Sequence, residues 1–112
     1  MLLFGGGNLT KYHKAIRDKI PEIIKKSGNE CNVKTLSDSE FLAELEKKLG
    51  EEVSEYQDSK SLEELADILE VINRILDIKG IPKKKLEEIR IMKKDERGGF
   101  EKNLFLIDTS KS

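Results

Sequence analysis

The sequence has few of the residues that build covalent and metal-bound centres. Cys31 is the only cysteine and His13 the only histidine among 112 residues. An intrachain disulfide, a cysteine-based zinc site and a histidine-rich metal site are therefore excluded, and a Ser-His or Cys-His nucleophilic centre is a remote alternative. The single cysteine also favours a cytoplasmic protein.

Long apolar runs, tryptophan and an excess of one charge are missing too. No run approaches the roughly 20 apolar residues of a membrane span, and the N-terminus lacks the basic segment of a signal peptide. Because 21 basic residues stand against 22 acidic ones, the net charge of -1 gives no global argument for a nucleic-acid or membrane partner. Any enzyme chemistry then depends on carboxylates, lysines, arginines and a hard metal ion.

The length supports one modest core, with 37% hydrophobic and 38% charged residues. We expect a flexible leader over residues 1–10, a single helical domain over 11–108 and a short C-terminal tail over 109–112. Capping signals and apolar periodicity predict four helices. Their expected ranges are 18–28, 38–57, 61–79 and 83–97.

Local signals also predict how these elements begin and end. Asp18 is expected to cap the first helix, and capping boxes at Ser37–Glu40 and Ser61–Glu64 open the second and third. Weak alternation predicts a small β element in which residues 31–36 pair with residues 100–107. The fold class is therefore mainly α with a minor β element.

Acidic residues at i,i+3 spacing fall on the two central helices, and their place on each helix matters more than their number. At about 100° per residue, Glu52 lies inside the apolar arc of the 38–57 helix, with Glu55 just off its edge. On the 61–79 helix, Glu64 lies deep within the apolar sector and Asp67 at its margin. Antiparallel packing of the two helices would bring these four carboxylates together.

A carboxylate on an apolar face is costly unless it is paired, hydrogen-bonded or bound to a cation. Four converging acidic oxygens without histidine or cysteine are typical of a site for Mg²⁺ or Mn²⁺. The alternative is that Glu52 and Glu64 form buried salt bridges with basic residues. The candidate partners are Lys48, Arg74 and Arg90.

The apolar sector of the 61–79 helix spans roughly 240°, wider than a surface helix needs. A chain of this length has few helices to cover it, so we expect a homo-oligomer, either a dimer or a tetramer. The interface candidates on this helix are Leu62, Leu65, Leu69, Ile72 and Leu76.

The run Glu51-Glu52-Val53-Ser54-Glu55, followed by Glu64-Leu65-Ala66-Asp67, resembles the acidic signature of the all-α nucleoside triphosphate pyrophosphatases. That superfamily includes MazG, the dimeric dUTPases and phosphoribosyl-ATP pyrophosphohydrolase. The segments 16–24 and 94–102 resemble those of small MazG-like proteins, so the resemblance covers about residues 10–107. It implies an all-α helical bundle completed by oligomerisation.

The resemblance also implies an activity, namely Mg²⁺-dependent cleavage between the α and β phosphates of a (d)NTP to a monophosphate and pyrophosphate, in a house-cleaning role. By that similarity Glu52, Glu55, Glu64 and Asp67 would hold the metal. Glu51 would be a ligand in some members, and otherwise a neighbouring group or a base for the attacking water.

A triphosphate substrate also needs fixed positive charge. The candidates for phosphate contact are Arg17, Lys19, Lys94 and Arg97, and Asn73 is a candidate for reading the base or sugar. Two alternatives stay open, namely phosphoribosyl-ATP pyrophosphohydrolase of histidine biosynthesis and a non-catalytic nucleotide-binding oligomerisation module. The near-neutral charge gives little support to a nucleic-acid partner.

Overall fold

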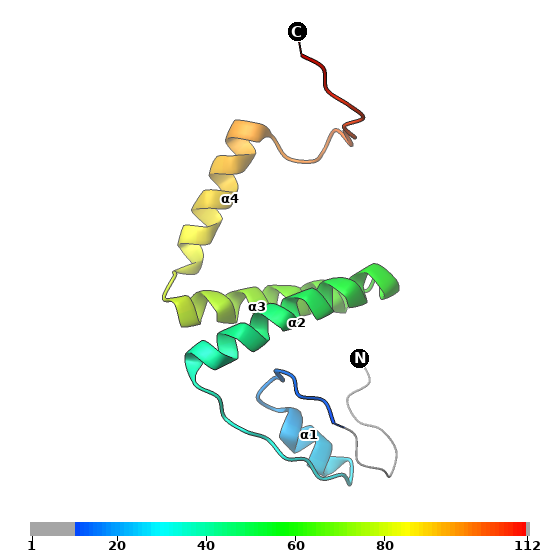
Figure 1. Cartoon of the computed structure of the whole chain (residues 1–112), viewed down its shortest axis with the longest axis vertical. Helices are drawn as coiled ribbons and strands as arrows, with labels where there is room; N and C mark the ends of the chain where they lie inside the picture. Colours follow the sequence, from blue (N-terminus) through cyan, green and yellow to red (C-terminus); the bar gives the residue numbers. More distant parts are fainter. Residues whose placement is uncertain (1–10, 112) are drawn as a thin grey trace. The chain divides into compact units, whose positions relative to one another are not determined.

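The computed structural model describes residues 11–111, so the leader expected at residues 1–10 lies outside the described residues. Within that range the chain forms four helices and no strand, which confirms the mainly α class (Figure 1). The described residues divide into two compact units, one ending at Gly80 and the other beginning at Ile81. The domain expected over 11–108 spans both units, and each is described here by itself.

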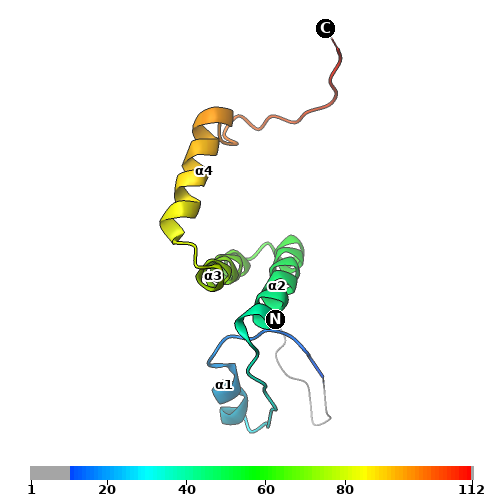
Figure 2. The same ribbon diagram turned by 60° about the vertical axis from the view of Figure 1, so that its left-hand side comes forward.

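The first unit is built on two long helices, α2 over Asp38–Ser59 and α3 over Leu62–Lys79. Because only two residues join them, they fold back on each other as an antiparallel hairpin and lie side by side (Figure 2). Few of their apolar side chains are fully enclosed. The buried hydrophobic residues of the described range are Ala15, Leu45, Val71 and Leu76.

The ends of α2 follow the sequence closely. At its start, the Ser37 hydroxyl accepts from the Glu40 N–H, and the Glu40 carboxylate accepts from the Ser37 N–H, so the predicted capping box is confirmed. At its end, Lys60 adopts a left-handed conformation with φ 58°. The short link to α3 is therefore a tight turn.

The start of α3 differs from the prediction. Ser61 caps the helix by accepting from the Glu63 N–H, but Glu64 makes no reciprocal bond, so the second capping box is wrong. The physical reason is that the Glu64 carboxyl lies beside Glu52 of α2 instead, with an oxygen of each within 4.8 Å of the other. Gly80 ends the helix in the left-handed region at φ 67°, as its position predicts.

Helix α1 is shorter than expected and covers Ile20–Lys26. The predicted Asp18 cap is wrong, because Lys19 occupies the N-cap in a helical conformation and no side chain caps the helix. Pro21 lies in the first turn, where its missing N–H costs nothing. Gly28 follows the helix at φ 90°.

The predicted β element is wrong, since neither residues 31–36 nor residues 100–107 form a strand. A two-stranded ladder without a covering layer is marginal in water, and the second segment has nothing to cover it. Its side chains from Phe100 to Ile107 are all exposed. The run from Leu104 to Ile107 is also continuously apolar rather than alternating, so it has no single buried face.

The second unit contains α4, which covers Lys83–Arg97. All of its residues are exposed, and its charges pair locally, as in the ion pair of Arg90 with Glu87. Gly98 follows the helix at φ 85°, which matches the predicted stop. No helix among residues 11–111 is long and apolar enough to cross a membrane.

Candidate metal centre

Three carboxylates meet where α2 packs against α3. One oxygen from each of Glu52, Glu64 and Asp67 lies within 4.8 Å of the other two. Glu52 comes from α2, whereas Glu64 and Asp67 are three residues apart on α3 and so share one face of that helix. Of the four carboxylates expected to converge, these three do and could hold a metal ion, whereas Glu55 is not part of the group.

Glu52 is the most enclosed member of the cluster, with only 2% of its surface exposed. Its Oε2 atom has no hydrogen-bond partner, and neither do the buried Oε2 atoms of Glu55 and Glu64. Buried carboxylate oxygens normally find donors. Two of these oxygens, on Glu52 and Glu64, belong to the cluster, so the cluster could take up a cation.

The surroundings of Glu52 oppose its ionisation. Burial is the main reason that the pKa of Glu52 rises to about 7, and the adjacent carboxyl group of Glu64 and the negative charges of Glu55 and Asp67 raise it further. The ammonium of Lys48 acts in the opposite direction. The metal-free cluster is therefore short of positive charge, which is the condition under which acidic clusters take up cations.

Lys48 is the basic residue nearest in sequence to this cluster, one helical turn before Glu52. Its Nζ lies 3.6 Å from Glu52 Oε1, so one of the salt bridges considered from the sequence is present. The other candidate bases are engaged elsewhere, because Arg74 pairs with Asp38 at 3.7 Å and Arg90 with Glu87. Among the ion pairs of the described residues none involves Glu64, so the salt-bridge alternative accounts for only part of the cluster.

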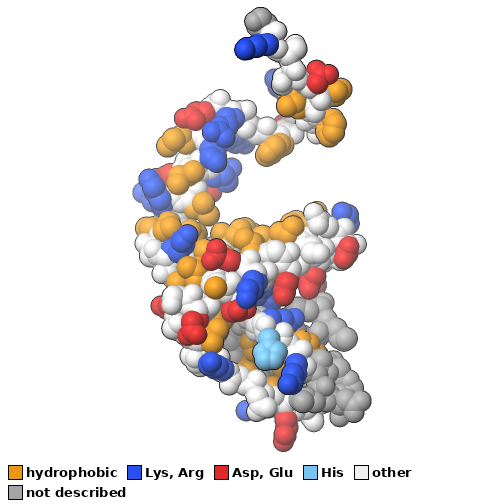
Figure 3. Space-filling model, in the orientation of Figure 1, with side chains coloured by type: hydrophobic (Ala, Val, Ile, Leu, Met, Phe, Trp, Pro, Cys, Tyr) orange, Lys and Arg blue, Asp and Glu red, His pale blue; other side chains and the backbone are white. Residues whose placement is uncertain are grey.

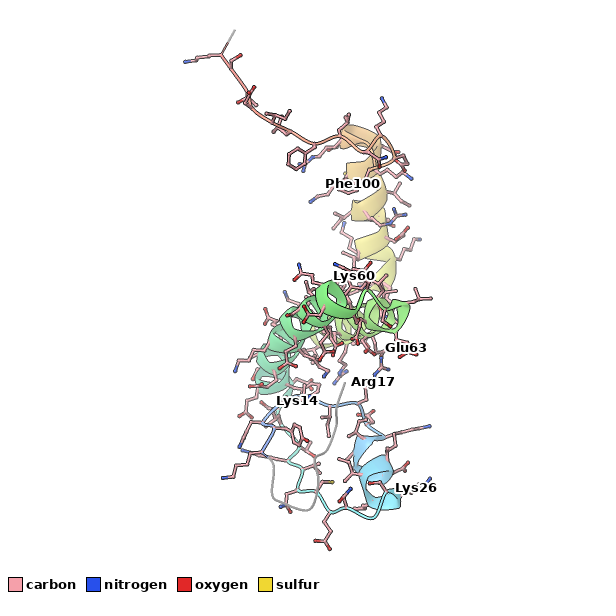
Figure 4. All side chains as sticks on the ribbon, turned by 90° about the vertical axis from the view of Figure 1, so that its right-hand side faces the viewer. Lys14, Arg17, Lys26, Lys60, Glu63 and Phe100 are labelled. Carbon is pink, nitrogen blue, oxygen red and sulfur yellow. The ribbon has the colours of Figure 1, made fainter. Side chains whose placement is uncertain are left out.

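Arg17 reaches the cluster from the segment before α1 (Figure 4). Its guanidinium donates to Asp67 Oδ1 over 2.7 Å, and both side chains keep substantial contact with solvent. Sequence reasoning placed Arg17 among the phosphate contacts but could not foresee this partner, because 50 residues separate the two. The contact places one positive charge at the open edge of the acidic cluster.

A cavity of about 280 Å³ adjoins the carboxylates. Its charged walls include both members of two ion pairs, Lys48 with Glu52 and Arg17 with Asp67. The apolar part of the lining comes from all three helices of the unit and the segment before α1. These residues are Ala15, Ile16, Ile20, Phe41, Leu45 and Val71.

The remaining sequence candidates occupy different places. Glu51 is exposed on α2, Lys19 is exposed at the start of α1, and Asn73 is half-buried on α3 but does not line the cavity. Lys94 and Arg97 belong to the unit that begins at Ile81, where Lys94 lies 3.5 Å from Glu101. The first unit therefore supplies the acidic cluster and only part of the expected cationic set.

Comparison with known proteins adds a likeness over part of the chain. No family model matches it. An uncharacterized protein of Mycolicibacterium smegmatis is 52% identical over 40 residues, which make up 36% of this chain and 41% of that protein. The matched stretch is thus less than half of either chain. No solved structure matches.

Proposed function

We propose that this chain is a Mg²⁺-dependent nucleoside triphosphate pyrophosphohydrolase of the all-α, MazG-like class. It would cleave the α–β phosphoanhydride of a (d)NTP, giving a nucleoside monophosphate and pyrophosphate, in a house-cleaning role. The observation that carries the proposal is the convergence of Glu52, Glu64 and Asp67 within 4.8 Å. The resemblance of the Glu51–Glu55 and Glu64–Asp67 runs to that superfamily supplies the reaction.

The donor set fits the metal. Carboxylates alone suit hard cations such as Mg²⁺ or Mn²⁺, which share their ligand shells with phosphate oxygens and water. Glu52, Glu64 and Asp67 would hold the ion, and Glu55 would join them through its unpartnered Oε2. A bound Mg²⁺ neutralises charge on phosphate oxygens and activates water for attack.

The protein's own groups would position the substrate. Arg17 stands at the edge of the cluster, where its positive charge would attract the phosphates once a metal ion satisfies Asp67. Glu51, which directly precedes Glu52 and is exposed, would accept a proton from an attacking water. The apolar lining of the cavity, which includes Phe41, offers a surface for the uncharged part of the nucleotide.

Self-association is part of the proposal. Three leucines of α3 are exposed along the helix, with exposed fractions of 80% for Leu62, 40% for Leu65 and 62% for Leu69. Figure 3 shows hydrophobic side chains on the visible surface of the helical pair. A second copy of the chain would cover these leucines and complete the small core in a homodimer or tetramer.

The direct test is pyrophosphate release from a panel of NTPs, dNTPs and phosphoribosyl-ATP, with Mg²⁺ or with EDTA, for the wild type and Glu64→Gln. We expect release only with Mg²⁺ and at least about 100-fold slower turnover in the variant, because a metal ligand is lost. The best substrate separates a house-cleaning enzyme from the histidine-pathway activity.

Two outcomes would contradict the proposal. Release that persists in EDTA would exclude a metal-dependent reaction. Nucleotide binding of equal strength with Mg²⁺ and Ca²⁺, without pyrophosphate release with either ion, would identify a non-catalytic nucleotide-binding module.

A further inference from the structure

Lys48 is an unusual lysine because its charged end is buried. The residue is 8% exposed, and its Nζ has no hydrogen-bond partner. The Glu52 oxygen with which it pairs lies 3.6 Å away, which is longer than a hydrogen bond. All three donors of this ammonium are therefore unused.

An ammonium in this state is costly, since lysines are rarely enclosed and usually extend their charge into solvent. Hydrogen bonds to acceptors lower that cost, but among the described residues Lys48 has only the ion pair with Glu52 at 3.6 Å. A neighbouring lysine shows the ordinary behaviour. Lys47 has a side chain that is 71% exposed and donates to Glu44 over 3.1 Å on the surface of the same helix.

The cavity beside the carboxylates is where the unused donors of Lys48 can find acceptors. Lys48, Arg17 and Arg74 all line it, and its 280 Å³ is close to the lower end of small-molecule pockets, about 300 Å³. Arg17 is already hydrogen-bonded to Asp67 and Arg74 pairs with Asp38. Of these three cations, Lys48 is the one whose ammonium is both buried and without a hydrogen bond.

We propose that Lys48 is a phosphate-binding residue of this site, donating from its ammonium to a phosphate oxygen of the ligand in the cavity. The assignment rests on the proposed function and deepens it, because it names a phosphate contact that the sequence motifs did not supply. In the free protein Lys48 serves as the counter-charge of Glu52. When a divalent cation neutralises Glu52 instead, the Lys48 ammonium needs another anion as its partner.

This arrangement couples the two ligands. A cation on Glu52 deprives Lys48 of its partner, so an anion that satisfies Lys48 binds better after the cation, and by linkage the cation binds better after the anion. Removing the ammonium should weaken the anion and should not weaken the cation, because one positive charge that repels the metal is gone. A lysine with a purely structural role would not produce this opposite pair of effects.

The test uses Mn²⁺ and inorganic pyrophosphate as probes and measures each Kd by titration calorimetry, alone and in the presence of the other. The variants are Lys48→Met, which keeps most of the length of the side chain without its charge, Lys48→Gln, which keeps a polar end should the first fold poorly, and Lys48→Arg, which keeps the charge. Lys47→Met is the matched control on the exposed face. Thermal melts establish that each variant is folded.

We expect Lys48→Met and Lys48→Gln to weaken pyrophosphate binding in Mn²⁺ by about 10- to 100-fold, the loss of one or two charge-assisted hydrogen bonds. Their Kd for Mn²⁺ alone should be unchanged or lower. Lys48→Arg should recover part of the pyrophosphate affinity, and Lys47→Met should stay within about twofold of the wild type.

Two results would overturn the assignment in distinguishable ways. If the wild type binds Mn²⁺ and cleaves nucleotides, but folded Lys48→Met and Lys48→Gln bind pyrophosphate as tightly as the wild type does, the role of Lys48 fails and the proposed function stands. If the wild type binds no Mn²⁺, the proposed function fails and the Lys48 assignment fails with it.

Discussion

Glutamates behave in opposite ways in the two units of this chain. On α4, Glu87 is exposed and accepts from Arg90, and this hydrogen bond lowers the pKa of Glu87. On α2, burial raises the pKa of Glu52 to about 7, and its charged neighbours are three carboxyl groups and the single ammonium of Lys48. The same residue type is a solvated surface charge in one unit and a costly enclosed charge in the other.

The difference follows from the position of each residue on its helix and not from the density of acids. Helix α4 also carries a run of acidic and basic residues, yet all of its side chains are exposed and none of its carboxylates lines the cavity beside Glu52. Glu52, in contrast, lies on the face of α2 that packs against α3, where its carboxylate is shielded from water. That loss of water is what creates a demand for a cation.

The largest expected effect concerns the exposed leucines of α3, a helix of the first unit. If a second copy covers the exposed leucines, Leu69→Asp should weaken self-association by about 100-fold or more, because it places a charge in the interface. Light scattering should then give the mass of one chain for the variant and a multiple of it for the wild type. Asp77→Asn, at an exposed polar position of the same helix, should leave the mass unchanged. A wild type of single-chain mass would refute the oligomer.

A second effect sharpens the contrast between Glu52 and Glu87. Between about pH 4.5 and 7 the folded metal-free protein keeps a proton on Glu52 that the unfolded chain has released, so its free energy of unfolding should fall as the pH rises through this range. We expect a loss of about 1–3 kcal/mol between pH 5 and pH 8 in EDTA, measured by urea denaturation. Saturating Mg²⁺ should reverse much of it at pH 8.

Glu64→Gln tests the cause of that pH dependence. Removing one of the mutually repelling carboxylates should leave the metal-free protein as stable as the wild type or more stable at pH 8, and should reduce the slope. Glu88→Gln, on the exposed α4, should keep the wild-type slope. A marked loss of stability in Glu64→Gln without metal would instead support a buried salt bridge at Glu64.

The smallest effects contrast two glycines, one in each unit. Gly50 lies inside α2, and a methyl group there would meet nothing within 4 Å, so Gly50→Ala should raise the free energy of unfolding by about 0.5–1 kcal/mol. Gly98 has φ 85°, where a side chain is strained, so Gly98→Ala should disfavour the backbone that follows α4. Urea denaturation would measure the change in the free energy of unfolding for Gly50→Ala. Amide chemical shifts around residue 98 would show whether Gly98→Ala changes the backbone there. If Gly50→Ala lowers the free energy of unfolding, another segment or a second copy of the chain must pack against α2 at Gly50.

Much of the first unit was predictable from the sequence because the signals are local. Ser37 and Glu40 fix the start of α2, Gly80 fixes the end of α3, and helical periodicity places Glu52 on the packed face. The convergence of Glu52 with Glu64 then follows from the short link between the helices. These features depend on neighbours within a few residues or on one hairpin.

Features that depend on distant partners were not predictable. The Arg17–Asp67 ion pair joins residues 50 positions apart, and no pattern in the sequence predicts it. Lys48 was among the candidate salt-bridge partners of the inward glutamates, but nothing in the sequence indicated that its ammonium would be enclosed without a hydrogen bond. The strand expected at residues 100–107 failed because apolar content was taken as β structure where no partner strand exists among the described residues.

The central claim is that the inward carboxylates of α2 and α3 form one cation site. It is tested most directly by adding substoichiometric Mn²⁺ to isotope-labelled protein and recording the paramagnetic broadening of each backbone amide. We predict that the broadening is strongest around Glu52, Glu64 and Asp67 and disappears in Glu64→Gln. Weak broadening spread over all exposed carboxylates, those of α4 included, and unchanged in the variant would contradict the claim.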